Sequence, residues 1–250
     1  MEQSLLDYTL HLADNALILG QRNAAWCGHG PVLEQDIAIT NISLDLVGQA
    51  RNLYQYAAQL AADGSTEDSL AYLRTEREFK NCLLVEQPNG DWAQTILRQF
   101  FFSAYQYLLY RELQNSADEQ LSAIAAKALK EVTYHLRWSS EWVIRLGDGT
   151  EESHRRIVHA VDELWMYTGE LFEMTGYETD AAQSGKGVHT KAFKDEWMKK
   201  VKDIFSEATL DLPEKAFMQK GGKEGKHSEH MGYILTDLQY LQRTYPGAEW

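Results

Sequence analysis

The sequence is poor in the residues that several classes of protein require. It has two cysteines and four prolines in 250 residues, and 24 lysines and arginines against 37 aspartates and glutamates. Two cysteines do not make a disulfide scaffold. The formal charge of −13 excludes sequence-independent binding to nucleic acid or to an anionic membrane surface, because both need a basic face.

Long apolar runs are also missing. No stretch of about 18 apolar residues occurs, and no basic-then-apolar leader opens the chain. We therefore expect no membrane span and no export, and a cytoplasmic location, where the two cysteines stay reduced. The 44% of hydrophobic residues predicts a globular protein and not a disordered one.

Apolar residues recur at helical spacing nearly throughout, and no alternating strand pattern is visible. Pro31, Pro88 and Pro213 lie in short polar breaks, where proline ends a helix. Long helices joined by short breaks predict an all-α bundle with additional helices, a single domain over residues 1–250. The expected helices cover residues 4–24, 32–62, 67–85, 92–114, 117–146, 151–174, 190–208 and 229–243. Ser65 and Thr66 are candidate caps of the third helix, Thr150 caps the sixth, and a loop is expected over 176–188.

Three carboxylates lie on helix faces that are otherwise largely apolar. Asp14 has leucine or isoleucine at positions −4, +3 and +4, Asp45 lies in a polar stripe between apolar neighbours, and Glu131 shares a face with two tryptophans. A carboxylate in such a setting is costly unless it is paired, hydrogen-bonded or bound to metal. Asp14 and Asp45 are 31 residues apart on consecutive helices, so an antiparallel pair would bring them face to face.

Carboxylate di-iron bundles use such a layout: two helices each supply a Glu, and the other two each supply a Glu-x-x-His pair. The sequence does not complete this set. Three places after Asp45 stands Gly48, and three places after Glu131 stands Tyr134, with the nearest histidine one place too far. Residues 99–101, about 31 places before Glu131 on the preceding expected helix, contain no carboxylate. We interpret the following residues as positions of a degenerate di-iron site: Asp14, Asp45, Gly48, Glu131, Tyr134 and His135.

Two cations lie close enough in the pattern to replace the charge of a missing metal. Lys127 is one turn before Glu131, and Arg98 lies on a helix rich in aromatic residues, among them Phe100–Phe102. They either form a buried ion-pair network with the remaining carboxylates or lie at the surface and cover apolar area with their stems. The aromatic helix itself is expected at the centre of the bundle or at an interface. Cys27 and Cys82 are expected to be buried as small apolar residues.

A glycine-rich basic segment, Lys220–His227, stands out in this acidic chain. Its glycine NH groups and ammonium groups suit either a contact with a partner subunit or a phosphate, such as one of coenzyme A. His227 and His230 are expected to cap a helix or meet a partner, with a metal as the alternative. Literal Glu-x-x-His strings at Glu151–His154 and Glu224–His227 are not expected to bind metal, since the first opens a helix and the second lies among glycines. The segment's candidate residues are Lys220, Lys223, Lys226, His227 and His230.

With these residues in view, the chain resembles the C subunits of bacterial phenylacetyl-CoA epoxidases, which belong to multicomponent oxygenases. The resemblance covers nearly the whole length. Its most specific segments are residues 26–62, 83–102 (LLVEQPNGDWAQTILRQFFF), 125–139 (AAKALKEVTYHLRWS) and 221–250 (GGKEGKHSEHMGYILTDLQYLQRTYPGAEW).

The resemblance implies a ferritin-like helical fold and a structural subunit without catalytic activity or a cofactor of its own. In that family a paralogous A subunit holds the di-iron centre, binds phenylacetyl-CoA and pairs with the C subunit. The complex with its further subunits uses O2 and electrons from NADPH to convert the aromatic ring to a 1,2-epoxide during phenylacetate degradation. The alternative is a di-iron carboxylate oxygenase with its own metal site.

Overall fold

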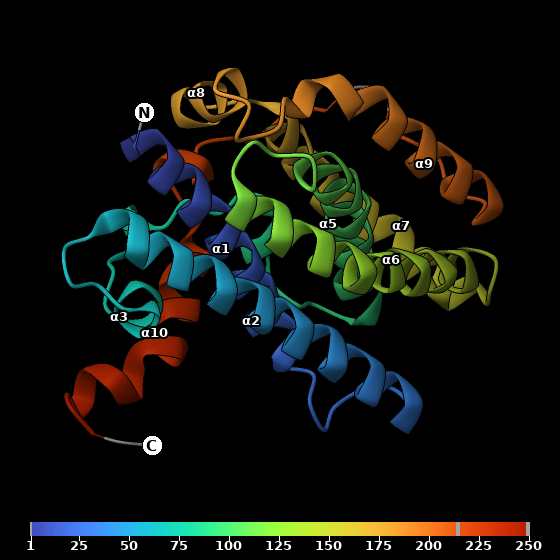
Figure 1. The fold of residues 1–250 in the computed structure, drawn as a ribbon. Helices are drawn as coiled ribbons and strands as arrows, with labels where there is room; N and C mark the ends of the chain where they lie inside the picture. The colour runs from blue at the N-terminus through green and yellow to red at the C-terminus, as the bar shows by residue number, and fades with distance from the viewer. Residues whose placement is uncertain (1, 214–215, 249–250) are drawn as a thin grey trace.

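The computed structural model describes residues 2–213 and 216–248, and in these residues all regular structure is helical. Four long helices pack as two antiparallel pairs, α1 with α2 and α5 with α6, and α2 also packs on α6 (Figure 1). This is the predicted all-α bundle, with the four-helix core of a ferritin-like fold. The long helices are α1 (Glu2–Ala24), α2 (Leu33–Ala61), α5 (Trp92–Leu113) and α6 (Glu119–Gly147).

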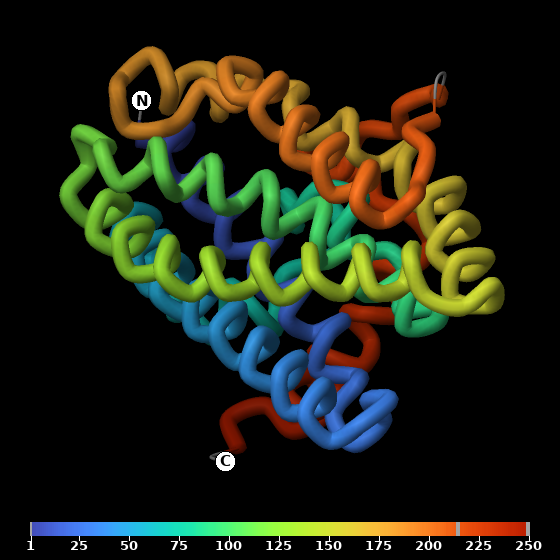
Figure 2. The backbone as a smooth tube through the Cα atoms, turned by 90° about the vertical axis from the view of Figure 1, so that its right-hand side faces the viewer, coloured from blue at the N-terminus to red at the C-terminus, as the bar shows by residue number. Residues whose placement is uncertain are grey.

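Shorter helices cover this core. Figure 2 shows α9 running across the α5–α6 pair, while α10 projects from the opposite side of the molecule in Figure 1. No helix in the described ranges is both long and apolar enough to cross a membrane. The shorter α-helices are α3 (Glu67–Tyr72), α4 (Leu83–Glu86), α7 (Glu151–Leu164), α8 (Gly176–Gln183), α9 (Lys194–Glu207) and α10 (Glu229–Thr244), and the 3-10 segments are Glu76–Glu78, Trp165–Tyr167, Gly169–Phe172, Thr190–Phe193 and Gly222–Glu224.

The helices begin where their side chains satisfy free backbone NH groups. Thr66 and Thr150 each accept a hydrogen bond from the NH group three residues later, as the sequence predicts. Asp91 and Asp118 do the same for α5 and α6. α5 is buried on nearly every side, Phe100–Phe102 included, so this helix lies at the centre of the molecule.

The predicted helix over residues 67–85 is wrong. The structure has three short pieces there, α3, the 3-10 turn Glu76–Glu78 and α4. A new cap at Thr75 begins the middle piece, and the backbone NH of Lys80 donates to the Asp14 carboxylate. An NH group that binds a distant side chain is not available to a helix, so the chain breaks here.

Three other expectations also need correction. The predicted loop over 176–188 contains α8, which opens with a capping box in which Thr175 and Glu178 exchange hydrogen bonds. The helix predicted over 151–174 ends at Leu164 and continues as two 3-10 segments. Cys82 is buried as expected, but Cys27 is exposed in the turn before α2.

The C-terminal end of α6 packs so closely on the end of α9 that only glycine fits at position 147. A Cβ atom on Gly147 would overlap the backbone carbonyl of Ala208. We expect Gly147→Ala to lower the free energy of unfolding by about 1–3 kcal/mol, because the backbones must separate. Urea unfolding followed by circular dichroism measures this change.

Gly48→Ala is the matched control. It lies inside α2, and a Cβ atom there meets nothing within contact distance. Alanine at this helical position should raise the free energy of unfolding by about 0.5–1 kcal/mol. Equal effects of the two substitutions would contradict the proposed close approach of α6 and α9.

Candidate functional site

The centre of the bundle, where α2, α5 and α6 meet, is a hydrogen-bonded chain built mainly from amide groups. The Gln106 side-chain NH2 on α5 donates to Oε1 of Gln49 on α2 at 3.1 Å, and the Tyr110 hydroxyl donates to the same oxygen at 3.3 Å. Gln49 in turn donates to the Glu131 carboxylate on α6 at 2.9 Å. All three donors are buried. Two neutral amides therefore link helices that, in a di-iron bundle, carry carboxylates.

One predicted pair does come together at this seam. Nε2 of His135 on α6 lies 3.0 Å from the Asp45 carboxylate on α2. Because a carboxylate only accepts, Nε2 carries the proton. His135 is fully buried, whereas the Asp45 side chain is 37% exposed, so the pair spans from the interior to the surface. Two buried atoms nearby in this seam, Nδ1 of His135 and Oε1 of Gln106, have no hydrogen-bond partner among the described residues.

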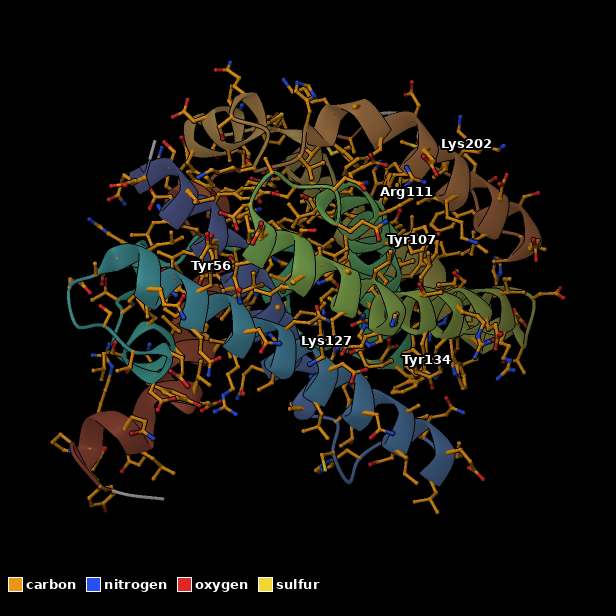
Figure 3. The ribbon with its side chains drawn as sticks, viewed as in Figure 1. Tyr56, Tyr107, Arg111, Lys127, Tyr134 and Lys202 are labelled. Atoms are coloured by element: carbon orange, nitrogen blue, oxygen red, sulfur yellow. The ribbon has the colours of Figure 1, made fainter. Side chains whose placement is uncertain are left out.

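The register that the sequence pattern indicates is wrong by one residue. Gly48 is half-buried with open space around it, and Tyr134 is exposed on α6 (Figure 3). Gly48 and Tyr134 therefore lie toward the outside of the bundle. The carboxylates three residues before them, Asp45 and Glu131, lie at the edge of the seam. One residue further along each helix, the pairs at Glu-x-x-His spacing are Leu46–Gln49 and Val132–His135, and all four residues are buried.

This donor set does not fit a di-iron centre. Leucine and valine stand where the two Glu-x-x-His pairs would begin, and neither has a donor atom. Gln49 stands where one of the two histidines would be, so His135 is the single imidazole of the two pairs. On α5, the amide of Gln106 stands in place of a carboxylate. Within residues 2–213 and 216–248, no group of three or more His, Cys, Asp or Glu side chains is arranged to hold a metal ion.

Asp14 belongs to a separate cluster and does not face Asp45. Its fully buried carboxylate pairs with Arg74, with 3.1 Å between Nη1 and Oδ2, and accepts the Tyr54 hydroxyl at 2.6 Å. The NH of Lys80 completes the set at 2.7 Å. Burial alone would lower the pKa of Arg74, but the adjacent Asp14 carboxylate raises it above its ordinary value. The cation that matches Asp14 thus comes from the broken segment after α3.

The two predicted charge replacements do not act on these carboxylates. Arg98 is fully buried but donates to the carbonyl groups of Gln87 and Pro88 and to the side chains of Asn23 and Asn89. Burial, with a smaller effect of the neighbouring Arg22, lowers the pKa of Arg98. It holds the turn before α5 in place. Lys127 is exposed on α6, and within the described residues it makes no ion pair (Figure 3).

The glycine-rich segment binds a carboxylate of the same chain, that of Glu170. The Glu170 carboxylate accepts the backbone NH groups of Gly221 and Leu83 at 2.7 Å each. Burial raises the pKa of Glu170. The Lys223 side chain, 3% exposed, donates to the Glu178 carboxylate at 2.9 Å. Burial would raise the pKa of Glu178, but Lys223 and then His11 more than offset this and lower it.

His227 is also an internal anchor. Nδ1 of its ring lies 2.7 Å from the Glu86 carboxylate and Nε2 lies 3.0 Å from the carbonyl oxygen of Phe79, so both ring nitrogens face acceptors. Only the doubly protonated ring donates to both. Burial alone would lower the pKa of His227, but Glu86 raises it above its ordinary value. The backbone NH of Ser228 also donates to Glu86, which fixes the start of α10.

The remaining residues of this segment lie closer to the surface. Lys220 forms an exposed pair with Glu173 at 3.3 Å. Lys226 is exposed and His230 is half-buried, and neither side chain has a hydrogen-bond partner in the described part of the chain. Of the literal Glu-x-x-His strings, His154 bonds the carbonyl of Gly147 at 2.7 Å and His227 bonds Glu86, so the structure does not bring either string together as a pair of ligands.

Several residues of these clusters escape sequence reasoning. The partners of the buried charges come from distant segments that read as surface or loop, and no local spacing connects them. The amides are a partial exception, because Gln99 and Gln106 are seven residues apart on an aromatic helix and so share a face. The missed residues are Gln49, Gln106, Tyr110, Arg74, Glu86, Glu170 and Glu178.

The sequence of this bundle is similar to those of known proteins. A family model described as "Phenylacetic acid catabolic protein" matches residues 1–250. The chain belongs to this family. It is also similar to the C subunit of the 1,2-phenylacetyl-CoA epoxidase of Escherichia coli strain K12, with 48% identity over 246 residues that cover 98% of this chain and 99% of that protein.

In this member of the phenylacetic acid catabolic protein family, Asp14 and Arg74 join α1 to the segment between α3 and α4. We expect Arg74→Met to lower the free energy of unfolding by about 3–5 kcal/mol, because Asp14 stays buried without its counter-charge. Adding Asp14→Asn to that variant should recover part of the loss. Urea unfolding of the single and double variants measures the coupling.

Arg51→Met is the control for that experiment, since Arg51 is 70% exposed and lies 3.6 Å from Glu67. This pair should contribute less than about 1 kcal/mol. If Arg74→Met and Arg51→Met had the same effect, the proposed importance of the buried pair would be wrong.

The raised pKa of His227 makes stability depend on pH in one direction. A group whose pKa is higher in the folded state contributes fully below its unfolded pKa of about 6.5 and loses this contribution as pH rises through the folded value. The stability advantage of the natural chain over His227→Gln should therefore be greatest at acidic pH and shrink as the solution becomes alkaline. Urea unfolding at a series of pH values tests this.

His159→Gln is the control, because His159 is exposed on α7. The difference in free energy of unfolding between His159→Gln and the natural chain should change little with pH. An advantage of His227 that grew with rising pH would show that the ring is held neutral and not doubly protonated.

Proposed function

We propose that this chain is the non-catalytic structural subunit of a phenylacetyl-CoA 1,2-epoxidase, and that it stabilises a catalytic A subunit during phenylacetate degradation. The observation that carries this proposal is the 48% identity to a C subunit of that enzyme over 98% of the chain. A similarity that spans both proteins from end to end supports the same role in the same kind of assembly. A cytoplasmic location stays a prediction.

The interior of the bundle supports the non-catalytic part of the proposal. The seam of α2, α5 and α6 is joined by Gln49 and Gln106, and hydrophobic residues occupy the places where carboxylate ligands would begin the Glu-x-x-His pairs. We assign the di-iron centre and the oxidation of the ring to the partner A subunit, and no cofactor to this chain. The buried amides of Gln49 and Gln106 hydrogen-bond each other, and this link joins α2 to α5 without a metal.

An exposed face of α2 supports a role beside a partner. Leu33, Ile37, Leu44 and Val47 recur at spacings of four, seven and three residues, which places them on one side of the helix. They are 71%, 51%, 64% and 42% exposed, although the same helix buries its other side against α1 and α6. Exposed apolar residues gathered on one side of a helix are typical of a protein–protein interface.

The experiment is co-expression of this chain with the A subunit, followed by size exclusion and iron analysis of each separated chain. We expect one stable complex with iron in the A subunit and no stoichiometric iron in this chain. Leu44→Asp with Val47→Asp should weaken the complex by about 2 kcal/mol or more, about thirtyfold in Kd, because two charges would be buried at the interface.

Val158→Asp, on the exposed side of α7, is the matched control and should leave the complex intact. Two results would contradict the proposal. Stoichiometric iron and O2 consumption by this chain alone would identify it as a di-iron oxygenase. Failure to associate with the A subunit would remove the structural role.

A further inference from the structure

A groove separate from the bundle centre lies between α5, α6 and α9. Its volume is about 440 Å³, within the usual range for small-molecule sites. The floor is apolar and comes from all three helices. Its residues are Ala104 and Leu108 of α5, Leu136 and Ile144 of α6, and Ile204 of α9.

The groove is formed because α9 is fastened to the bundle at both ends. Near its start, the buried Trp197 donates from its ring NH to the carbonyl of Phe101 at 3.1 Å. Just past its end, Ala208 lies against Gly147. Lys200 and Ile204, between these two points, line the groove. Because both ends are fixed by close packing, the space beneath the middle of α9 is part of the fold.

The charged side chains at the rim differ in whether they already have a partner of opposite charge. Glu196 is held by Arg111 through two hydrogen bonds of 2.6 and 2.9 Å, and Glu141 lies 3.8 Å from Arg145. Arg137 stacks over the ring of Tyr134 at 5.8 Å. Neither Arg137 nor its neighbour across the groove, Lys200, has a carboxylate partner within the described residues.

The rim therefore offers two cations to a ligand, while its two carboxylates already face arginines outside the groove. Figure 3 shows Tyr107 and Arg111 in the space between α6 and α9 and Lys202 on the outer side of α9. An apolar floor beside unpaired cations matches a molecule with an apolar body and one negative charge.

We propose that this groove binds a small amphiphilic carboxylate, with its hydrocarbon body on the apolar floor and its carboxylate between Arg137 and Lys200. Arginine and lysine donate charge-assisted hydrogen bonds to a carboxylate, and Tyr107 covers the apolar body from the side. The groove lies apart from the seam of α2, α5 and α6, and it would give the chain a ligand of its own.

The test is isothermal titration of the purified full-length chain with octanoate, 4-phenylbutanoate, octanamide and octylammonium. We expect at least one of the two carboxylates to bind, and the neutral amide and the cation to bind at least about tenfold more weakly. The ratio of the two carboxylates then distinguishes an aliphatic from an aromatic body. Arg137→Gln with Lys200→Gln should weaken the carboxylate by about tenfold.

Lys202→Gln is the matched control, because it removes the same charge from α9 outside the groove, and it should leave Kd unchanged. Ile204→Trp should abolish binding by filling the floor, and circular dichroism confirms that this variant is folded. The proposal is overturned if neither carboxylate binds, if octanamide binds as tightly as octanoate, or if Lys202→Gln weakens binding as much as the double variant.

Discussion

The ion pair between Asp14 and Arg74 determines how the first third of the chain is arranged. A fully buried carboxylate requires a counter-charge and donors for its remaining lone pairs, and Arg74, Tyr54 and the NH of Lys80 provide them. Arg74 and Lys80 lie in the segment after α3, which lacks continuous helical hydrogen bonds and runs in irregular form across α1. The irregular segment is thus the part of the chain that supplies the counter-charge and a backbone donor for this buried carboxylate.

The same constraint separates the two kinds of polar interior in this protein. Around α1 and α4, buried charges are neutralised by side chains and NH groups from far along the sequence. At the seam of α2, α5 and α6, the polar groups are mostly neutral amides that bond one another. A di-iron centre would need several carboxylates at that seam, whereas Gln49 and Gln106 join the helices there as neutral groups.

Helical periodicity was enough to predict the four long helices, because each buries a continuous face. It failed at residues 67–85, where Arg74 and Lys80 serve Asp14, and the register of the presumed ligands was wrong by one residue. An antiparallel contact fixes which side of a helix faces inward, and the polar residues Asp45 and Glu131 lie at the edge of that contact, so they are poor guides to its centre. The capping pair of Thr175 and Glu178 was visible in the sequence and would have predicted α8.

The glycine-rich segment near the C-terminus has a consequence for the order of folding. Glu170 accepts the NH of Gly221, Glu178 pairs with Lys223, and Glu86 pairs with His227. Residues 221–228 are synthesised after almost all of the bundle has been made, so a nascent chain carries three carboxylates that still lack these partners. Burial of those carboxylates is unfavourable until the segment emerges from the ribosome, so the structure around α4 and α8 closes only after residues 221–228 have been made.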